Sequence, residues 1–211
     1  MKKMAEAENE EPRPRDDSLI IDHGETDGIR LRILRGAMTT FGRLGYGATS
    51  VESILEEAGV SRRTFYKHFR SKEDVFHALY DRAVEQLLHA VRTAEVPAEG
   101  GVVARVIRAV EAYIDAHEKA GPFANVMLLE QFTPGSLLAQ QRQEAMATFA
   151  RLISNAARRA GVIDLDPLVV SGVVAGINAI CVECASNADM NGWDTTRALA
   201  AIRKLLRGLG D

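Results

Sequence analysis

Cysteine is scarce in this sequence, and so are aromatic residues. The 211 residues include 2 cysteines and 1 tryptophan, and aromatic residues account for 6% of the chain. Cys181 and Cys184 have a C-x-x-C spacing inside an apolar helical pattern. A metal or redox site with this spacing needs a second pair of ligands or a strand-to-helix setting, and the sequence offers neither. We therefore expect two small buried residues, with a metal or redox site as the alternative.

Long apolar runs are also missing. No continuous apolar segment approaches the roughly 18 residues of a membrane-spanning helix. The N-terminus is polar and acidic, and it lacks the apolar segment of a secretory signal peptide. These absences predict a cytoplasmic protein that has no membrane partner.

Catalytic motifs are absent as well. The sequence contains no glycine-rich phosphate loop, no G-x-S-x-G and no H-E-x-x-H. Its 5 histidines are scattered, and the spacing pairs none of them with a carboxylate. We expect no enzyme activity, no cofactor and no metal. An enzyme and a helical scaffold that binds only protein stay open as alternatives, which binding to a defined DNA duplex would exclude.

Charge is distributed unevenly, although the net charge of the whole chain is only −3. Residues 1–27 carry 4 basic and 9 acidic side chains, a net charge of −5. Residues 28–94 carry 11 basic and 7 acidic side chains, a net charge of +4, and residues 95–211 carry 11 and 13, a net charge of −2. A phosphate-binding module requires a positive segment of this kind. The middle segment is therefore the candidate for DNA binding.

That segment contains the pattern of a helix-turn-helix between Thr49 and Glu73. Thr49 and Glu52 fit a capping box at the start of a short helix. One apolar face follows at helical spacing, with Val51, Ile54, Leu55 and Ala58. Gly59 supplies the turn, because glycine adopts a left-handed backbone without steric cost.

The next helix is predicted from Arg62 to Phe69, with Ser61 as its N-cap. Phe65 and Phe69 share a buried face, which leaves the basic and polar side chains pointing elsewhere. Arginine can donate two hydrogen bonds to guanine in the major groove. Recognition helices contact bases mainly through their N-terminal residues, which here are Ser61, Arg62, Arg63 and Thr64. Ser71 and Asp74 then form a capping box that opens a long third helix.

These motifs make the segment from about residue 28 to residue 90 resemble the DNA-binding domain of the TetR family of bacterial transcriptional regulators. The matching positions are Thr49, Ile54, Ala58, Gly59, Val60, Ser61, Thr64, Phe65, Tyr66, His68, Phe69, Ser71, Lys72 and Glu73. The C-terminal half shows no matching motif, which is usual in this family because its ligand domains diverge.

The resemblance implies a homodimer that binds a palindromic operator, usually as a repressor, until a small-molecule effector releases it. By position, Arg62, Arg63 and Lys67 would face bases. Four further residues would hold phosphates: Thr49, Tyr66, His68 and Lys72. Many members have a small residue or proline where this chain has Arg63, and the departure favours a guanine-containing half-site.

The predicted fold class is all-α: an N-terminal three-helix helix-turn-helix domain joined by a long helix to a C-terminal helical ligand-binding and dimerisation domain. Residues 1–27 lack periodicity and are predicted to form a disordered acidic tail. The DNA-binding domain covers residues 28–94, and Pro97, Gly100 and Gly101 mark the boundary before a C-terminal domain at residues 101–211. Outside the helix-turn-helix, helices are predicted at about 28–44, 102–119, 123–131, 134–160, 166–187 and 194–209.

The last two of these helices are predicted to form the dimer interface, because they pair with their symmetry mates in the family. Gly172 and Gly176 fit a close approach by another helix, since glycine inside a helix is otherwise unfavourable by about 1 kcal/mol. Tight packing within one subunit is the alternative explanation of both.

A ligand site is expected in the same C-terminal domain. Such sites are mostly apolar with a few converging polar groups. The candidates lie on helices that line the cavity in the family, and they are Tyr113, His117, Asn125, Met127, Phe132, Met146, Phe149, Asn178 and Glu183.

Overall fold

The protein is all-helical in the residues that the computed structural model describes, which are 28–93, 101–130, 136–159, 161, 166–186 and 195–207. Nine helices and no strand occupy these ranges. They are α1 (Gly28–Ala48), α2 (Val51–Ala58), α3 (Arg62–His68), α4 (Lys72–Thr93), α5 (Gly101–Ala120), α6 (Pro122–Glu130), α7 (Ala139–Arg159), α8 (Pro167–Ser186) and α9 (Thr195–Arg207). The acidic tail, Pro97, Phe132 and Asp194 fall outside the described residues.

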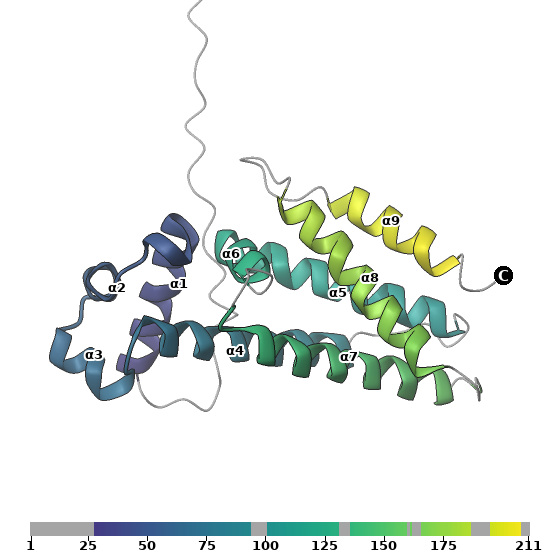
Figure 1. The fold of residues 1–211 in the computed structure, drawn as a ribbon, viewed down its shortest axis with the longest axis horizontal. Helices are drawn as coiled ribbons and strands as arrows, with labels where there is room; N and C mark the ends of the chain where they lie inside the picture. The colour runs from purple at the N-terminus through teal and green to yellow at the C-terminus, as the bar shows by residue number, and fades with distance from the viewer. Residues whose placement is uncertain are drawn as a thin grey trace, which may run out of the picture.

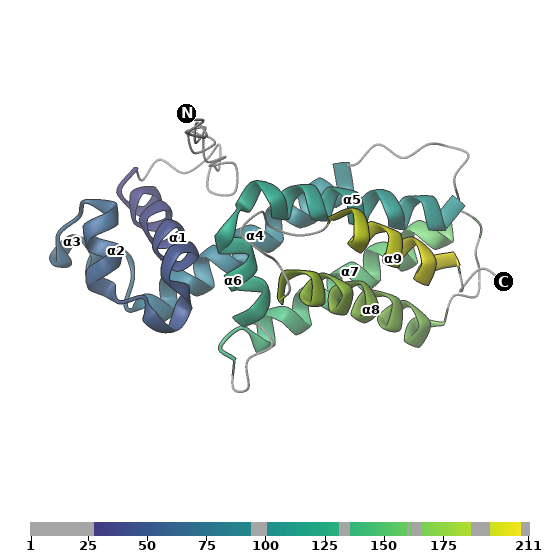
Figure 2. The same cartoon turned by 90° about the horizontal axis from the view of Figure 1, so that it is seen from above.

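The helices form two groups that α4 connects. Helices α1, α2 and α3 lie at one end of the molecule, and α5 to α9 lie at the other (Figure 1). Helix α4 starts beside α3 and reaches between α5 and α7 (Figure 2). The predicted fold class is therefore confirmed, and α3 stands at the far end of the molecule from α9.

The predicted helix positions agree with the structure to within a few residues, with one clear exception. The helix expected from Pro134 begins only at Ala139, since residues 136–138 are not helical. There the Ser136 hydroxyl accepts a hydrogen bond from the backbone N–H of Leu138 at 3.0 Å, which is a local turn. Asp166 caps α8, because its carboxylate accepts a hydrogen bond from the backbone N–H of Leu168 at 2.7 Å.

The core at the α1 end includes residues from both sides of the predicted domain boundary. Helix α1 buries Ile33, Leu34, Ala37, Met38 and Phe41, whereas Ile29 at its start is 40% exposed. The ring of Phe76 on α4 contacts both Phe41, at 4.9 Å between centroids, and Phe123 on α6, at 6.1 Å. Packing of α6 against α1 thus ties the α1 end of the molecule to the C-terminal helices.

A second core joins α5, α8 and α9. Its buried residues include Val106, Ile114, Cys181 and Ile202. Burial raises the pKa of the Cys181 thiol to about 12, so this cysteine is a neutral core residue at neutral pH. That placement agrees with the prediction of a buried residue for Cys181, whereas Cys184 is only half-buried beside the same core.

Two glycines bring helices into close contact. A Cβ on Gly36 would lie 2.8 Å from the Cβ and backbone N of Ala58, so glycine lets α1 and α2 touch. A Cβ on Gly176 would lie 3.0 Å from Leu205 on α9, which supports packing within one subunit at this position. A Cβ on Gly172 would meet nothing within 4 Å, so α9 does not explain this glycine.

Helix α8 corrects the expectation that the chain lacks an apolar segment of membrane-spanning length. Residues Pro167–Cys184 form an 18-residue window with a mean hydropathy of 1.8, which is long and apolar enough to cross a membrane by length and composition alone. A single helix of this kind is weak grounds for a membrane span, because core helices pass the same test. Only 22% of the window is buried within the protein, so α8 leaves an apolar face uncovered.

Candidate nucleic-acid interface

The N-cap of helix α2 is Ser50, one residue later than the sequence pattern indicates. The Ser50 hydroxyl accepts from the N–H of Ser53 at 3.1 Å, and the Ser53 hydroxyl accepts from the N–H of Ser50 at 3.0 Å. The capping box therefore joins two serines, and the predicted box of Thr49 with Glu52 is wrong. Serine can replace the usual Glu here because its short side chain still reaches the N-cap N–H.

The turn from α2 to α3 is confirmed at Gly59, which adopts φ 61° and ψ 41° in the left-handed region. Arg32 on α1 also stabilises this turn. Its guanidinium donates to the carbonyl oxygens of Ala58 at 3.0 Å and Gly59 at 2.7 Å. The turn is fixed both by the glycine backbone and by α1.

Helix α3 is held by its N-cap and by one buried aromatic face. The Ser61 hydroxyl accepts from the N–H of Thr64 at 3.1 Å, as predicted, and pairs with the Thr64 hydroxyl at 2.8 Å. Phe65 is 0% exposed and Phe69 is 2% exposed, with their rings 6.0 Å apart. Phe65 within this seven-residue helix and Phe69 at its C-cap fix which face of the helix is turned to solvent.

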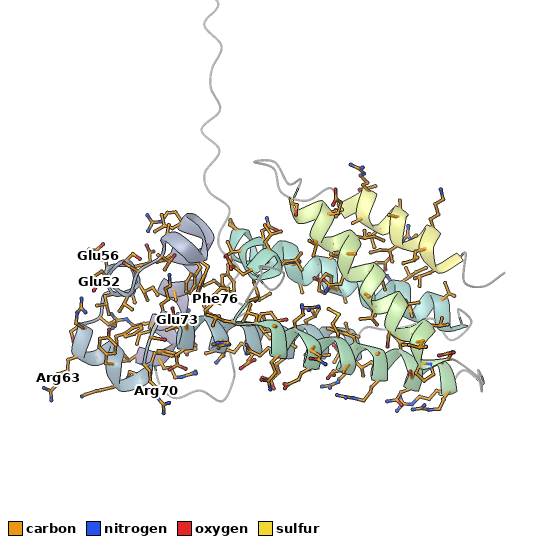
Figure 3. All side chains as sticks on the ribbon, viewed as in Figure 1. Glu52, Glu56, Arg63, Arg70, Glu73 and Phe76 are labelled. Carbon is orange, nitrogen blue, oxygen red and sulfur yellow. The ribbon has the colours of Figure 1, made fainter. Side chains whose placement is uncertain are left out.

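The solvent face of α3 carries the donors that a phosphate backbone and base edges accept. Arg63, Tyr66 and Lys67 are exposed, and Tyr66 stacks edge-on against Phe65 at 5.3 Å. The side chains of Arg63 and of Arg70, just beyond α3, point away from the body of the protein (Figure 3). Neither arginine side chain makes a hydrogen bond or ion pair with the described residues. Both guanidinium groups can meet an external partner without breaking an internal contact.

Arg62 differs from Arg63, because its guanidinium forms an ion pair with Glu52 on α2. Both side chains are more than half exposed. The pKa of Glu52 is lowered, first by a backbone hydrogen bond and then by the charge of Arg62. The predicted base contact of Arg62 would therefore be made next to a carboxylate.

The start of α4 anchors the turn between α1 and α2. The ammonium group of Lys72 donates to the carbonyl oxygens of Tyr46 at 2.9 Å and Thr49 at 2.7 Å, and it lies 4.5 Å from the Tyr46 ring centre. The Tyr46 hydroxyl donates to Glu73 at 3.1 Å. The pKa of Glu73 is lowered, mainly by the Ser71 side chain. Lys72 thus serves as a structural clamp, and only its third N–H is left for the phosphate contact expected from the sequence.

Thr49 is not placed as expected. Its side chain is 2% exposed, and its hydroxyl donates to the carbonyl oxygen of Gly45 at 2.7 Å. A buried hydroxyl with its proton already donated cannot hold a phosphate, so the predicted role of Thr49 is corrected. Thr64 and His68 are half-buried beside the exposed face of α3.

Comparison with known proteins identifies the segment that carries this surface. The family model described as "Bacterial regulatory proteins, tetR family" matches residues 33–79, which run from α1 through α3 into α4. The chain belongs to the TetR family. This is a family of transcriptional regulators and not of enzymes.

Individual TetR-family relatives match about half of the chain or more. The chain is 36% identical over 99 residues to the transcriptional repressor AcnR of Corynebacterium diphtheriae, which is 47% of this chain and 48% of AcnR. It is 34% identical over 97 residues to the transcriptional activator FasR of Mycolicibacterium smegmatis, which is 45% of this chain and 44% of FasR. The chain thus spans about half the length of these curated relatives. A solved TetR-family structure, PfmR of Thermus thermophilus, covers 83% of this chain and 97% of its own, with a TM-score of 0.62 and 25% identity.

Beyond the matched segment, an apolar cavity lies between α4, α5, α7 and α8. Its volume is about 90 Å³. Four predicted ligand residues line it: Tyr113, Met146, Phe149 and Asn178. Sequence reasoning missed the other eight, since all are aliphatic and look like any core residue: Val91, Val106, Ala109, Val110, Leu152, Ile153, Val174 and Ile177.

The remaining predicted ligand residues do not line this cavity. His117 is buried one turn beyond Tyr113, with the two rings 5.5 Å apart, and burial lowers its pKa to about 4. Asn125 and Met127 lie on α6, where Met127 packs against the core at the α1 end. Glu183 is exposed, and Phe132 lies outside the described residues.

Proposed function

We propose that this protein is a homodimeric transcriptional regulator that binds a palindromic operator through α3. The observation that carries the proposal is the exposed donor face of that helix, with Arg63, Tyr66 and Lys67 held outward by buried Phe65 and Phe69. Arg63 reads a guanine, because a free guanidinium can donate to its O6 and N7. Tyr66, Lys67 and Arg70 hold phosphates and set the register.

The roles of the remaining predicted DNA contacts follow from their positions. Ser61 and Thr64 cap α3 and present the helix N-terminus to a phosphate. Arg62 can contact a base only with the part of its guanidinium that the ion pair with Glu52 leaves available. His68 at the end of α3 and Lys72 at the start of α4 lie beside the exposed face, where each can reach a phosphate.

We propose dimerisation through α8 and α9. Leu168 is 80% exposed and Val169 is 43% exposed on α8, and Leu205 is 36% exposed on α9. Large apolar side chains at this exposure, next to Gly172 with open space above it, form a surface that a second copy would bury. A dimer would place two copies of α3 about one helical turn of DNA apart, roughly 34–36 Å, or a multiple of it.

Release by a small molecule is the regulatory half of the proposal. The cavity between α4, α5, α7 and α8 would hold the effector, and α4 leads from that cavity to the helix-turn-helix. Among the relatives, AcnR is a repressor and FasR is an activator, so we adopt repression because it fits ligand release. The second candidate function, a helical scaffold that binds only protein, has no specific observation in its favour.

Selection from a random duplex library tests the operator. The full chain is incubated with the library at two salt concentrations, and bound duplexes are sequenced and then titrated by fluorescence anisotropy. The expected motif has two inverted half-sites that contain guanine, and its affinity falls as salt rises. Recovery of no motif over random duplex would overturn DNA specificity and favour the scaffold.

A further inference from the structure

The wall of the apolar cavity contains two polar side chains and no charged one. Tyr113 and Asn178 are the polar members of its twelve lining residues. Burial raises the pKa of the Tyr113 hydroxyl, so this group stays protonated and can donate. An ion in such a site would lose its hydration without meeting a countercharge, which is strongly unfavourable.

The side-chain amide of Asn178 is buried, but its hydrogen-bonding capacity is poorly satisfied. Its side chain is 8% exposed, and its Nδ2 donates to the thioether sulfur of Met146 at 3.6 Å. That is the one hydrogen bond of the Asn178 side chain among the described residues. Sulfur in a thioether is a weak acceptor, whereas buried amides normally find oxygen partners. A ligand oxygen would therefore be a better partner for Asn178 than Met146.

Met146 also lines a second cavity of about 290 Å³. The two cavities share Met146, Val174 and Asn178, and the second also includes Arg142 and Ser171. Methionine is unbranched and changes rotamer easily. A small movement of Met146 would free the Asn178 amide and enlarge the space, which a ligand of more than a few atoms requires.

We propose that this cavity binds an uncharged, mainly apolar small molecule with a single hydrogen-bonding group. That group replaces the Met146 thioether as the hydrogen-bond partner of the Asn178 amide. The apolar part of the molecule lies against the aliphatic side chains of α5 and α7. The inference rests on the proposed function only where it calls this molecule the effector. Binding itself requires no DNA.

Four probes of similar size test the chemistry: toluene, benzamide, benzoate and benzylammonium. Each is titrated at pH 7 into full-length protein with ¹³C-methyl-labelled methionine, and the Met146 signal is assigned with Met146→Leu. Toluene and benzamide are expected to shift the Met146 methyl resonance, and benzamide to bind at least about tenfold more tightly than either ion. No shift with toluene or benzamide at saturation would overturn the proposal, and so would tighter binding of benzoate, which would place an anion near Arg142.

Two variants separate the hydrogen bond from the cavity. Asn178→Leu should weaken benzamide by about tenfold and leave toluene unchanged, because only the amide loses a partner. Asn155→Leu on the exposed face of α7 is the matched control and should change neither. Ala109→Phe fills the cavity and should abolish toluene binding if the site is the one described. Equal loss of toluene and benzamide in Asn178→Leu would overturn the role of the amide.

Regulation is measured separately on the protein bound to its selected duplex. Benzamide that binds the protein but leaves the duplex bound would contradict the release mechanism and keep the chemistry of the site. Absence of duplex binding together with normal benzamide binding would contradict operator recognition alone. The two proposals therefore fail in different experiments.

Discussion

The carboxylate of Glu52 on α2 and the guanidinium of Arg62 on α3 form an ion pair beside the proposed DNA-binding face. Both belong to the short helices that flank the Gly59 turn, and both are exposed. A carboxylate at this place has two effects on a nearby duplex. It orients the arginine that it holds, and it repels phosphates that approach in other registers.

Replacing Glu52 with Gln should therefore strengthen binding to random duplex severalfold while lowering the ratio of operator to random affinity. The negative charge is lost, and Arg62 becomes free to meet any phosphate. Fluorescence anisotropy with both duplexes at two salt concentrations measures the effect. Glu56→Gln is the matched control, because Glu56 is also exposed on α2 and has no ion pair with Arg62. If both variants change the ratio equally, only net charge matters and the pair has no orienting role.

Arg63→Ala should weaken binding to the selected operator by about 1–3 kcal/mol and relax the preference for guanine at one position of each half-site. The reason is that its exposed guanidinium makes no internal contact that could compensate. Arg70→Ala should instead lower the affinity for all duplexes and reduce the salt dependence. Repeating the selection with each variant distinguishes the two roles. An unchanged guanine preference in Arg63→Ala would remove this residue from base reading.

The sequence predicted the helix-turn-helix because its signals are local. A cap, a left-handed glycine and two phenylalanines four residues apart act within a single turn, and Ser61, Gly59 and Phe65 are found as expected. The same logic placed the cap of α2 one residue early, since Thr49 and Ser50 are both good caps. The turn that precedes α2 decided between them, because the Thr49 hydroxyl already donates to the carbonyl oxygen of Gly45, four residues earlier.

Long-range relationships could not be read in this way. Lys72 matches a motif position, but its contacts with Tyr46 and Thr49 lie 26 and 23 residues away along the chain. The cavity is another example. Its polar members Tyr113 and Asn178 stood out in an apolar pattern, whereas residues such as Val106 and Ile177 differ from core residues only in facing empty space.

Gly36→Ala should lower the free energy of unfolding by about 1–3 kcal/mol, the usual range for forcing an extra methyl group into a packed site. Here the methyl would meet the backbone of Ala58, which cannot move without displacing α2. Urea denaturation followed by circular dichroism measures the change. Gly47→Ala is the control, since a Cβ there meets nothing within 4 Å. Equal stability of both variants would show that α1 and α2 can separate freely.

Leu168→Glu should weaken the proposed dimer by roughly tenfold or more, because a central apolar contact would become a buried charge. The isolated subunit should stay folded, since an acidic residue in the first turn of α8 interacts favourably with the helix dipole. Sedimentation equilibrium gives the dissociation constant. Leu137→Glu, at a residue 49% exposed before α7, is the matched control. A dimer that survives in Leu168→Glu would move the interface away from this end of α8.

Stability should also fall at mildly acid pH because of His117. Its folded-state pKa of about 4 lies below the unfolded value of 6.5, since burial disfavours the charged ring. The unfolded chain therefore binds the proton first as pH decreases. The resulting loss of stability begins near pH 6.5 and is complete below about pH 4. For this one group it amounts to about 2 kcal/mol between pH 7.5 and pH 5.

Urea denaturation of wild type and His117→Gln at both pH values isolates this contribution. Any structural cost of the substitution appears equally at both pH values, so the difference between them reports only protonation. The variant should lose less stability on acidification than wild type. His89→Gln, at an exposed position of α4, should keep the wild-type dependence. If His117→Gln keeps it as well, the ring is protonated in the folded state without penalty, and water must reach the space between α5 and its neighbours.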